Sequence, residues 1–126
     1  MFRRIPVLPL VSLEPIEVTA ALAMPHDLIV VDRSRRVLAA VSRDLPGSTT
    51  HCVDISHQAI PATADVVIAF NVICRLEPGR QPAGMGHVAA AVRAGGLLMM
   101  DDRTARANLS AHPEFTSMGE KTYRRA

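Results

Sequence analysis

An apolar run in the middle of the chain constrains the fold more than any other feature. Residues 66–70 follow Asp65 without a polar residue, and they are few and rich in β-branched side chains, so they indicate a strand. Because apolar and polar residues do not alternate, we expect both faces of this strand to be buried, as in a parallel sheet. Residues 28–31 and 97–100 are similar runs. Parallel strands need helical crossovers, so the chain is predicted to be an α/β protein.

The remaining segments carry signals for helices, turns and further strands. Pro6 and Pro9 each remove a ladder donor, so 5–11 is expected to be a poor or edge-like first strand. Pro15 suits a helix start, and Ser34 is a typical N-cap. The expected strands are 5–11, 28–31, 49–53, 65–70 and 97–100. The expected helices are 16–23, a segment after Ser34, 85–93 closed by Gly95-Gly96, and 105–112. His26-Asp27 is expected to be a turn, and 115–118 is expected to form an antiparallel hairpin with 121–124. This alternation predicts a doubly wound, mostly parallel sheet in one domain, 1–126.

Composition excludes several classes of protein. Hydrophobic residues make up 48% of the 126-residue chain, which argues against disorder. Aromatic residues make up only 3%, and acids are interspersed among the arginines, so nucleic-acid binding is not expected. No apolar run approaches the ~20 residues of a membrane span, and no membrane contact is expected.

The cellular setting follows from the N-terminus and the cysteines. Pro6 and Pro9 interrupt an N-terminal stretch that otherwise imitates a signal peptide. Cys52 and Cys74 are 22 positions apart in apolar contexts, so we expect them to be buried, reduced thiols. Both features indicate a cytoplasmic protein, and the preference for arginine over lysine is typical of a GC-rich bacterial genome.

Polar residues follow the predicted strands at the points where a ligand would bind. They are Ser12 and Glu14, Asp32, Asp54, Asn71 and Asp101. In doubly wound sheets, ligands bind outside the carboxyl ends of the strands. Asp32 lies 20 positions after Ser12, the usual offset between a cofactor-binding turn and an acid that binds ribose. The glycine-rich turn that normally accompanies such an acid is replaced by LVSLEP at 10–15.

The order of these features resembles a known family. After two acid-tipped strands come the segment ADVVIAFNVICRL at 64–76 and, beyond a predicted helix, VRAGGLLMM at 92–100. Over roughly residues 5–126, this order is similar to that of class I S-adenosylmethionine-dependent methyltransferases. Three shorter segments, SLEP at 12–15, FNVI at 70–73 and KTYRR at 121–125, resemble the catalytic domain of the chemotaxis-receptor glutamate methyltransferases. The chain would be a truncated version of this fold.

The resemblance implies a cofactor and residue roles. S-adenosylmethionine would be the cofactor, with Asp32 binding its ribose, Asp54 and Ile55 flanking the adenine, and Glu14 near the methionine end. Asn71 would line the methyl-transfer pocket. Methyl transfer from a sulfonium mainly needs positioning and desolvation, so the resemblance singles out no catalytic acid or base and no metal. The neighbours His51 and Cys52 would point to opposite faces of a strand, which excludes joint metal ligation.

Other interpretations of the same residues stay open. Asp32 could cap the helix near Ser34, Asp54 could be a turn residue, and Asn71 could satisfy backbone groups at a strand end. Because glycine is missing from 10–14, the chain could also be a non-catalytic interaction or regulatory module of the same fold, with a protein partner or as a homo-oligomer. A nicotinamide- or nucleotide-binding protein is a third alternative, disfavoured because G-x-G-x-x-G is absent.

Overall fold

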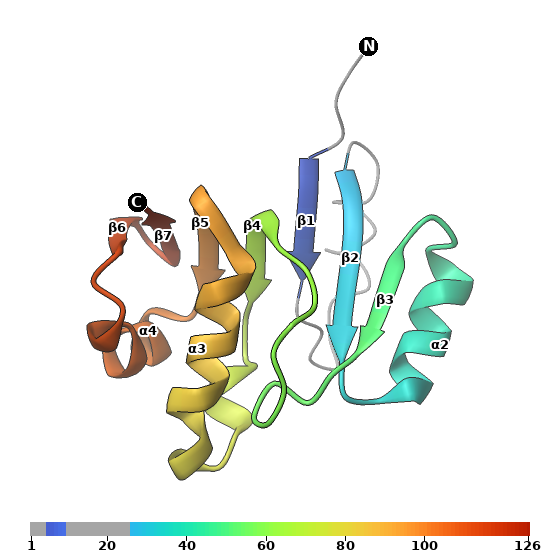
Figure 1. The fold of residues 1–126 in the computed structure, drawn as a ribbon, viewed down its shortest axis with the longest axis horizontal. Helices are drawn as coiled ribbons and strands as arrows, with labels where there is room; N and C mark the ends of the chain where they lie inside the picture. Colours follow the sequence, from blue (N-terminus) through green and yellow to red (C-terminus); the bar gives the residue numbers. More distant parts are fainter. Residues whose placement is uncertain (1–4, 10–25) are drawn as a thin grey trace.

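The molecule is built on one seven-stranded sheet with strand order β3-β2-β1-β4-β5-β7-β6 (Figure 1). The computed structural model describes residues 5–9 and 26–126. Strands β1 to β5 pair in parallel, while β7 lies antiparallel between β5 and β6. The strands are β1 Ile5–Pro9, β2 His26–Asp32, β3 Thr49–Cys52, β4 Ala64–Ala69, β5 Val92–Met100, β6 Phe115–Gly119 and β7 Thr122–Arg125. The predicted doubly wound sheet with a C-terminal antiparallel hairpin is confirmed.

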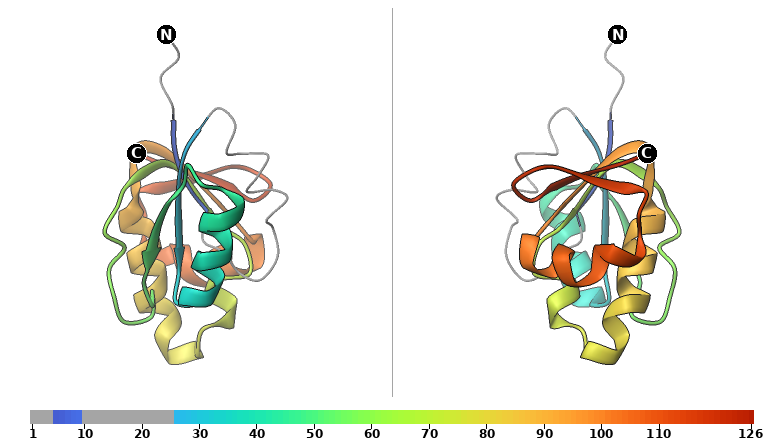
Figure 2. Two further views of the ribbon diagram at one scale, coloured as in Figure 1. Left: turned by 90° about the vertical axis from the view of Figure 1, so that its right-hand side faces the viewer. Right: turned by 90° about the vertical axis from the view of Figure 1, so that its left-hand side faces the viewer.

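Helices cover both faces of this sheet. They are α2 Arg35–Asp44, α3 Gln81–Ala91 and α4 Asp102–Asn108, with short 3-10 turns η1 Ile73–Arg75, η2 Pro78–Arg80 and η3 Leu109–Ala111. Figure 2 shows α2 and α3 on opposite sides of the sheet. The sequence dictates this arrangement at β2, where the neighbours Val30 and Val31 are both buried but belong to different core clusters. The predicted helix at 16–23 lies outside the described residues.

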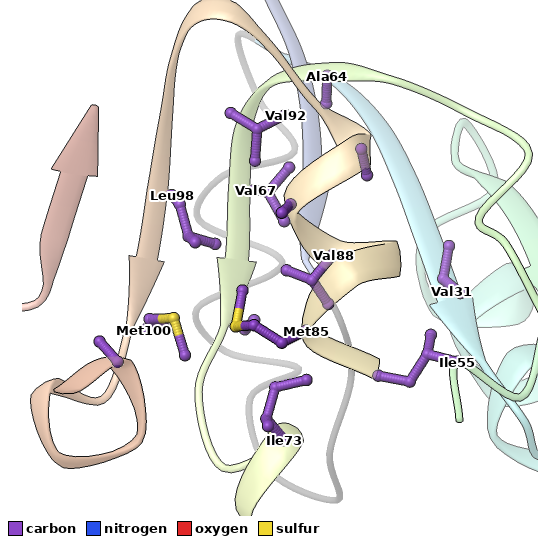
Figure 3. Packing of buried hydrophobic residues seen from close by; sticks show 14 of the residues in the cluster. Val31, Ile55, Ala64, Val67, Ile73, Met85, Val88, Val92, Leu98 and Met100 are labelled. Carbon is purple, nitrogen blue, oxygen red and sulfur yellow. The ribbon is translucent and has the colours of Figure 1, made fainter. Parts of the chain in front are cut away.

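The larger core cluster fills the space between α3 and the β4–β5 pair (Figure 3). Met85 and Val88 of α3, Val67 of β4 and Leu98 of β5 are completely buried. The central part of β4 is therefore covered as its unbroken apolar sequence predicts. On the other face, Val30 packs with a smaller cluster that includes Leu38 of α2.

The first strand is central, so the expectation of an edge-like strand was wrong. β1 pairs with β2 on one side and with β4 on the other. Pro6 lies in register with Asp27 of β2, whereas Pro9 lies in register with Ile68 of β4. The lost donors are thus divided between two ladders, which lets a strand with two prolines occupy the centre. His26 and Asp27, expected to form a turn, are the first two residues of β2.

The start of α3 and the role of the glycines after it also differ from expectation. α3 begins at Gln81, and Gly84 is buried in it, where an added Cβ would meet the Leu76 side chain. Glycine favours loops by propensity, but here it permits close packing on η1. Gly95 and Gly96 do not close α3, which ends at Ala91; they lie at an irregularity in the pairing of β5 with β4. Gly95 has a left-handed φ of 77° within β5, not at a helix cap.

Cys52 and Cys74 are free but exposed, so the prediction of buried thiols was wrong. Cys52 ends the edge strand β3, and Cys74 lies in a turn rather than in a strand. Among residues 5–9 and 26–126, no helix has the length and hydropathy that a membrane span requires.

Candidate functional site

The carboxyl ends of β2, β3, β4 and β5 meet at one edge of the sheet, the lower edge in Figure 1. Because these strands are parallel, the residues that follow them emerge on the same side. The structure therefore brings Asp32, Asp54, Asn71 and Asp101 to a common edge, as the sequence predicted. Glu14 lies outside the described residues. The four side chains at the edge differ in the hydrogen bonds that they make within the protein.

Asp32 is the last residue of β2 and keeps part of its carboxylate free of other described residues. Its Oδ1 accepts a hydrogen bond of 2.7 Å from the backbone N–H of Ser34. No described residue donates to Oδ2, and the side chain is half-buried. Ser34 in turn caps α2 by accepting from the Val37 N–H at 3.2 Å. Asp32 thus orders the β2–α2 turn with one oxygen and leaves the other available for a ligand hydroxyl.

Both carboxylate oxygens of Asp54 have partners within its own loop. Its Oδ1 accepts from the N–H and the hydroxyl of Ser56, at 3.0 and 2.5 Å, and its Oδ2 lies 3.1 Å from His57 Nδ1. The Ser56 hydroxyl, more than any other neighbour, lowers the pKa of Asp54, and the Ser56 N–H and His57 add to the effect against a smaller opposing effect of burial. Ser56 is itself buried. This group of an acid, a hydroxyl and an imidazole therefore orders a turn and presents no nucleophile to a substrate.

Ile55 points into the core rather than along the edge. Its side chain is only 7% exposed and belongs to the cluster around α3 (Figure 3). Its carbonyl oxygen lies 2.6 Å from Nδ1 of His87 in α3. What Ile55 can offer a ligand is therefore its backbone. The contact to His87 was not anticipated, since nothing in the sequence relates two positions 32 residues apart.

Asn71 and Asp101 join the ends of β4 and β5. Asn71 has a φ of 55°, and its N–H donates to Asp101 Oδ2 at 2.7 Å. Asparagine is one of the few residues that adopt this left-handed conformation readily. The position therefore has a structural reason to be asparagine, and its exposed side chain remains at the edge.

Asp102 was not singled out as a site residue, yet it connects β5 to the C-terminal hairpin. Its Oδ1 accepts from the hydroxyl of Tyr123 at 2.6 Å and from the N–H of Lys121 at 2.9 Å. These two donors lower the pKa of Asp102. Burial, together with the hydrogen bond to Asp102, raises the pKa of Tyr123 to about 12. Asp102 could be seen in the sequence, but its partners belong to the C-terminal hairpin, and the sequence did not show where that hairpin packs.

The described residues contain no group of three or more histidines, cysteines and acids that could hold a metal ion. Along the edge they supply two carboxylates with an oxygen that has no described donor, Asp32 and Asp101, and one exposed amide, Asn71. This arrangement can bind hydroxyl groups of a ligand.

Comparisons with known proteins agree on the fold. No family model and no curated protein matches this sequence. Among solved structures, the N-methyltransferase NodS from Bradyrhizobium japonicum, in complex with S-adenosyl-L-homocysteine, superposes with a TM-score of 0.74 at 14% identity, covering 95% of this chain and 77% of that one. A TehB-like SAM-dependent methyltransferase from Corynebacterium glutamicum gives a TM-score of 0.75 at 16% identity, covering 98% and 79%.

A third structure matches over a smaller part of its length. The sugar N-methyltransferase KedS8 from Streptoalloteichus has a TM-score of 0.65 at 20% identity, covering 78% of this chain and 40% of that one. Identities this low establish a likeness of fold. The chain has the α/β fold of class I S-adenosylmethionine-dependent methyltransferases, including the antiparallel strands at its C-terminal end.

Proposed function

We propose that this chain binds S-adenosylmethionine at the carboxyl edge of its sheet and serves a methyl-transfer reaction. The observation that carries the proposal is Asp32. Its place at the end of β2 is the place from which an acid reaches ribose hydroxyls in nucleoside-binding sheets. One of its oxygens has no donor among the described residues.

The described residues fit the nucleoside part of the cofactor best. Asp32 would accept hydrogen bonds from the ribose hydroxyls, and the bond from Ser34 holds its carboxylate in place. Near the adenine we assign the backbone of the 54–55 loop, because both Asp54 oxygens have partners and the Ile55 side chain is buried. Asn71 stays our candidate for the methyl-transfer pocket and Glu14 for the methionine end.

When bound, the cofactor supplies an electrophilic methyl group on a sulfonium. The protein's contribution to such a displacement is to orient the acceptor and exclude water, and it needs no general base if the acceptor is a carboxylate or an imidazole. A glutamate acceptor, which the chemotaxis-receptor resemblance implies, stays a prediction.

Calorimetric titration with S-adenosylhomocysteine tests the role of Asp32. Replacing it by alanine removes hydrogen bonds to a charged acceptor, each worth about 1.5–3 kcal/mol, so D32A should weaken binding at least about tenfold. D32N should bind with intermediate affinity, because its amide oxygen can still accept from Ser34.

Asp44→Ala is the matched control for this experiment. Asp44 is a largely exposed carboxylate at the far end of α2, and its contact with Arg43 is long, at 4.0 Å. This variant should bind like the wild type. Equal affinity of D32A and the wild type would overturn the assignment of Asp32.

The chief alternative is a non-catalytic module that keeps the fold and binds a protein instead. It is favoured by LVSL at 10–13, because bulky residues there replace the glycines that let a backbone approach a ligand. It is also favoured by Asp54, because both oxygens of that carboxylate have partners within the loop. It requires that the wild type show no heat of binding with millimolar S-adenosylmethionine or S-adenosylhomocysteine.

A further inference from the structure

The loop after β3, residues 54–58, is joined to the other described residues by a single hydrogen bond. Its remaining hydrogen bonds connect residues of the loop with one another. The exception is the carbonyl oxygen of Ile55, which lies 2.6 Å from Nδ1 of His87 in α3. Within the described chain, the loop is therefore held on α3 by this polar contact and by the buried side chain of Ile55.

The chemistry of the contact defines the state of the His87 ring. A carbonyl oxygen can only accept a hydrogen bond, so Nδ1 of His87 must carry a proton and donate it. In the neutral ring this leaves Nε2 without a proton. The hydrogen bond thus selects one of the two neutral tautomers of His87.

His87 fixes one peptide unit of the loop from the side of the helix. A peptide unit is planar, and its C=O and N–H groups point in opposite directions. The Ile55 carbonyl points to α3, and the Ser56 N–H of the same peptide donates to Asp54 Oδ1 at 3.0 Å. The orientation of this peptide is therefore determined from both sides, by His87 and by Asp54.

Helix α3 offers few polar groups apart from His87. It runs from Gln81 to Ala91, and Gln81 is the other residue in it with a polar side chain. Gly84 lies three positions before His87 and thus on the same face. It is buried, and a Cβ there would lie 3.8 Å from the Ile55 carbonyl oxygen. An otherwise apolar helix therefore directs a donor to the loop beside a position that has no side chain.

The loop keeps one backbone donor for a ligand. No described residue accepts a hydrogen bond from the N–H of Ile55. The carbonyl of the same peptide unit, that of Asp54, accepts from two N–H groups inside the loop, at 3.0 and 2.8 Å. The Ile55 N–H consequently points away from those two groups. Its direction relative to the sheet depends on how the loop lies on α3.

We propose that His87 is a positioning residue for recognition of the base: by holding the Ile55 carbonyl, it orients the loop backbone so that the site prefers adenine. The inference rests on the proposed function, in which this backbone lies next to the adenine. Loss of the His87 contact should therefore reduce the preference for adenine. It should not affect the contribution of Asp32, which concerns the ribose.

Calorimetric titration of the full chain with two ligands tests this role. They are S-adenosylhomocysteine and S-inosylhomocysteine, which share the ribose and the homocysteine. In the inosine compound N1 carries a proton, so a backbone donor that suits N1 of adenine meets another donor. The wild type should bind the adenine compound at least about tenfold more tightly.

Three substitutions of His87 separate its hydrogen bond from its bulk. H87L removes the donor and should reduce the preference for adenine to about threefold or less. H87N should retain most of the preference, because the amide nitrogen of asparagine is as many bonds from Cα as Nδ1 of histidine. H87Q places its nitrogen one bond farther away and should behave like H87L.

D32A is the matched control for the measured preference. It removes an acceptor for the ribose hydroxyls, which both ligands carry. The variant should therefore weaken both ligands by the same factor and leave the preference for adenine unchanged. A ratio of affinities is measured because a general loss of stability would lower both affinities together.

Nitrogen NMR of the histidine rings tests the contact in the wild type without ligand. Five histidines are present, and the spectrum of H87N identifies the signals of His87. When neutral, His87 should carry its proton on Nδ1. A proton on Nε2 instead would overturn the inference.

The titrations distinguish failure of this inference from failure of the proposed function. An unchanged preference for adenine in folded H87L would overturn the role of His87 and leave cofactor binding intact. A wild type that binds neither ligand at millimolar concentration would overturn both. Circular dichroism checks each fold; if H87L does not fold, equal preferences in H87N and H87Q would overturn the role of His87.

Discussion

Backbone atoms surround Gly96 so closely that one additional carbon atom does not fit. A Cβ at this position would lie 2.8 Å from the carbonyl oxygens of both Arg93 and Asp65. Neither oxygen belongs to a flexible side chain, so the chain must shift to accept an alanine. Gly96 is therefore required for β5 to run alongside β4 immediately after the irregularity at Gly95.

Replacing Gly96 by alanine should lower the free energy of unfolding by about 1–3 kcal/mol, the usual range for overpacking. Gly86→Ala is the matched control, because nothing lies within 4 Å of a Cβ there and the residue is inside α3. G86A should raise stability by about 0.5–1 kcal/mol. Urea unfolding measures both, and equal effects of the two substitutions would contradict this explanation.

Tyr123 gives a second test at the scale of one residue, since it is the chain's single tyrosine and there is no tryptophan. Burial and the hydrogen bond to Asp102 raise its pKa to about 12. An ultraviolet titration of the folded protein should show this value directly. D102N should lower it part of the way toward 10, because burial, the larger cause, remains.

The sign of the accompanying stability change follows from the direction of the shift. The folded pKa of Tyr123 lies above the unfolded value near 10, so its contribution is complete below pH 10 and is lost as the pH rises toward 12. For Asp54 and Asp102 the pKa is lowered, so their contributions are complete above the ordinary pKa near 4 and are lost as the pH falls below it. A tyrosine that titrates at 10 in the folded protein would contradict the contact with Asp102.

At the scale of elements, the turn from β2 into α2 links local stability to the candidate site. The N–H of Ser34 donates to Asp32, which positions the serine, and the Ser34 hydroxyl oxygen caps α2. This arrangement was predicted in part, because an N-cap serine is a local signal that needs no knowledge of the rest of the fold.

Ser34→Ala should lower the free energy of unfolding by about 1 kcal/mol through loss of the cap. Ser42→Ala tests the same substitution in the exposed interior of the same helix and should be neutral or slightly stabilising, because alanine has the higher helix propensity. Chemical denaturation compares the two. A loss in S42A as large as that in S34A would show that the cap contributes nothing.

Local sequence signals misplaced the elements whose positions depend on contacts with residues far away in the sequence. The start of α3 was predicted too late because Gly84 and Gly86 are poor helix formers, whereas in the fold Gly84 packs against Leu76. The two prolines suggested an edge for β1, and only pairing with β2 and β4 shows it to be central.

At the scale of the whole molecule, the sequence predicted the architecture and the residues that gather at the carboxyl edge. Both follow from one property of parallel sheets, because polar residues after apolar runs must emerge on the same side. The sequence could not show which of those side chains accept hydrogen bonds from other residues of the protein. That depends on Ser56 and His57 beside Asp54, and on Asn71 beside Asp101.

An NMR titration of the ¹⁵N-labelled chain with S-adenosylhomocysteine tests the central claim most directly, because amide shifts locate the ligand as well as detect it. The account predicts that the largest shifts fall after β2, β3 and β4, near Arg33, Asp54 and Asn71, while amides at the amino edge near Ala94 stay unchanged. An unchanged spectrum at millimolar ligand, or shifts concentrated at the amino edge, would contradict cofactor binding at Asp32.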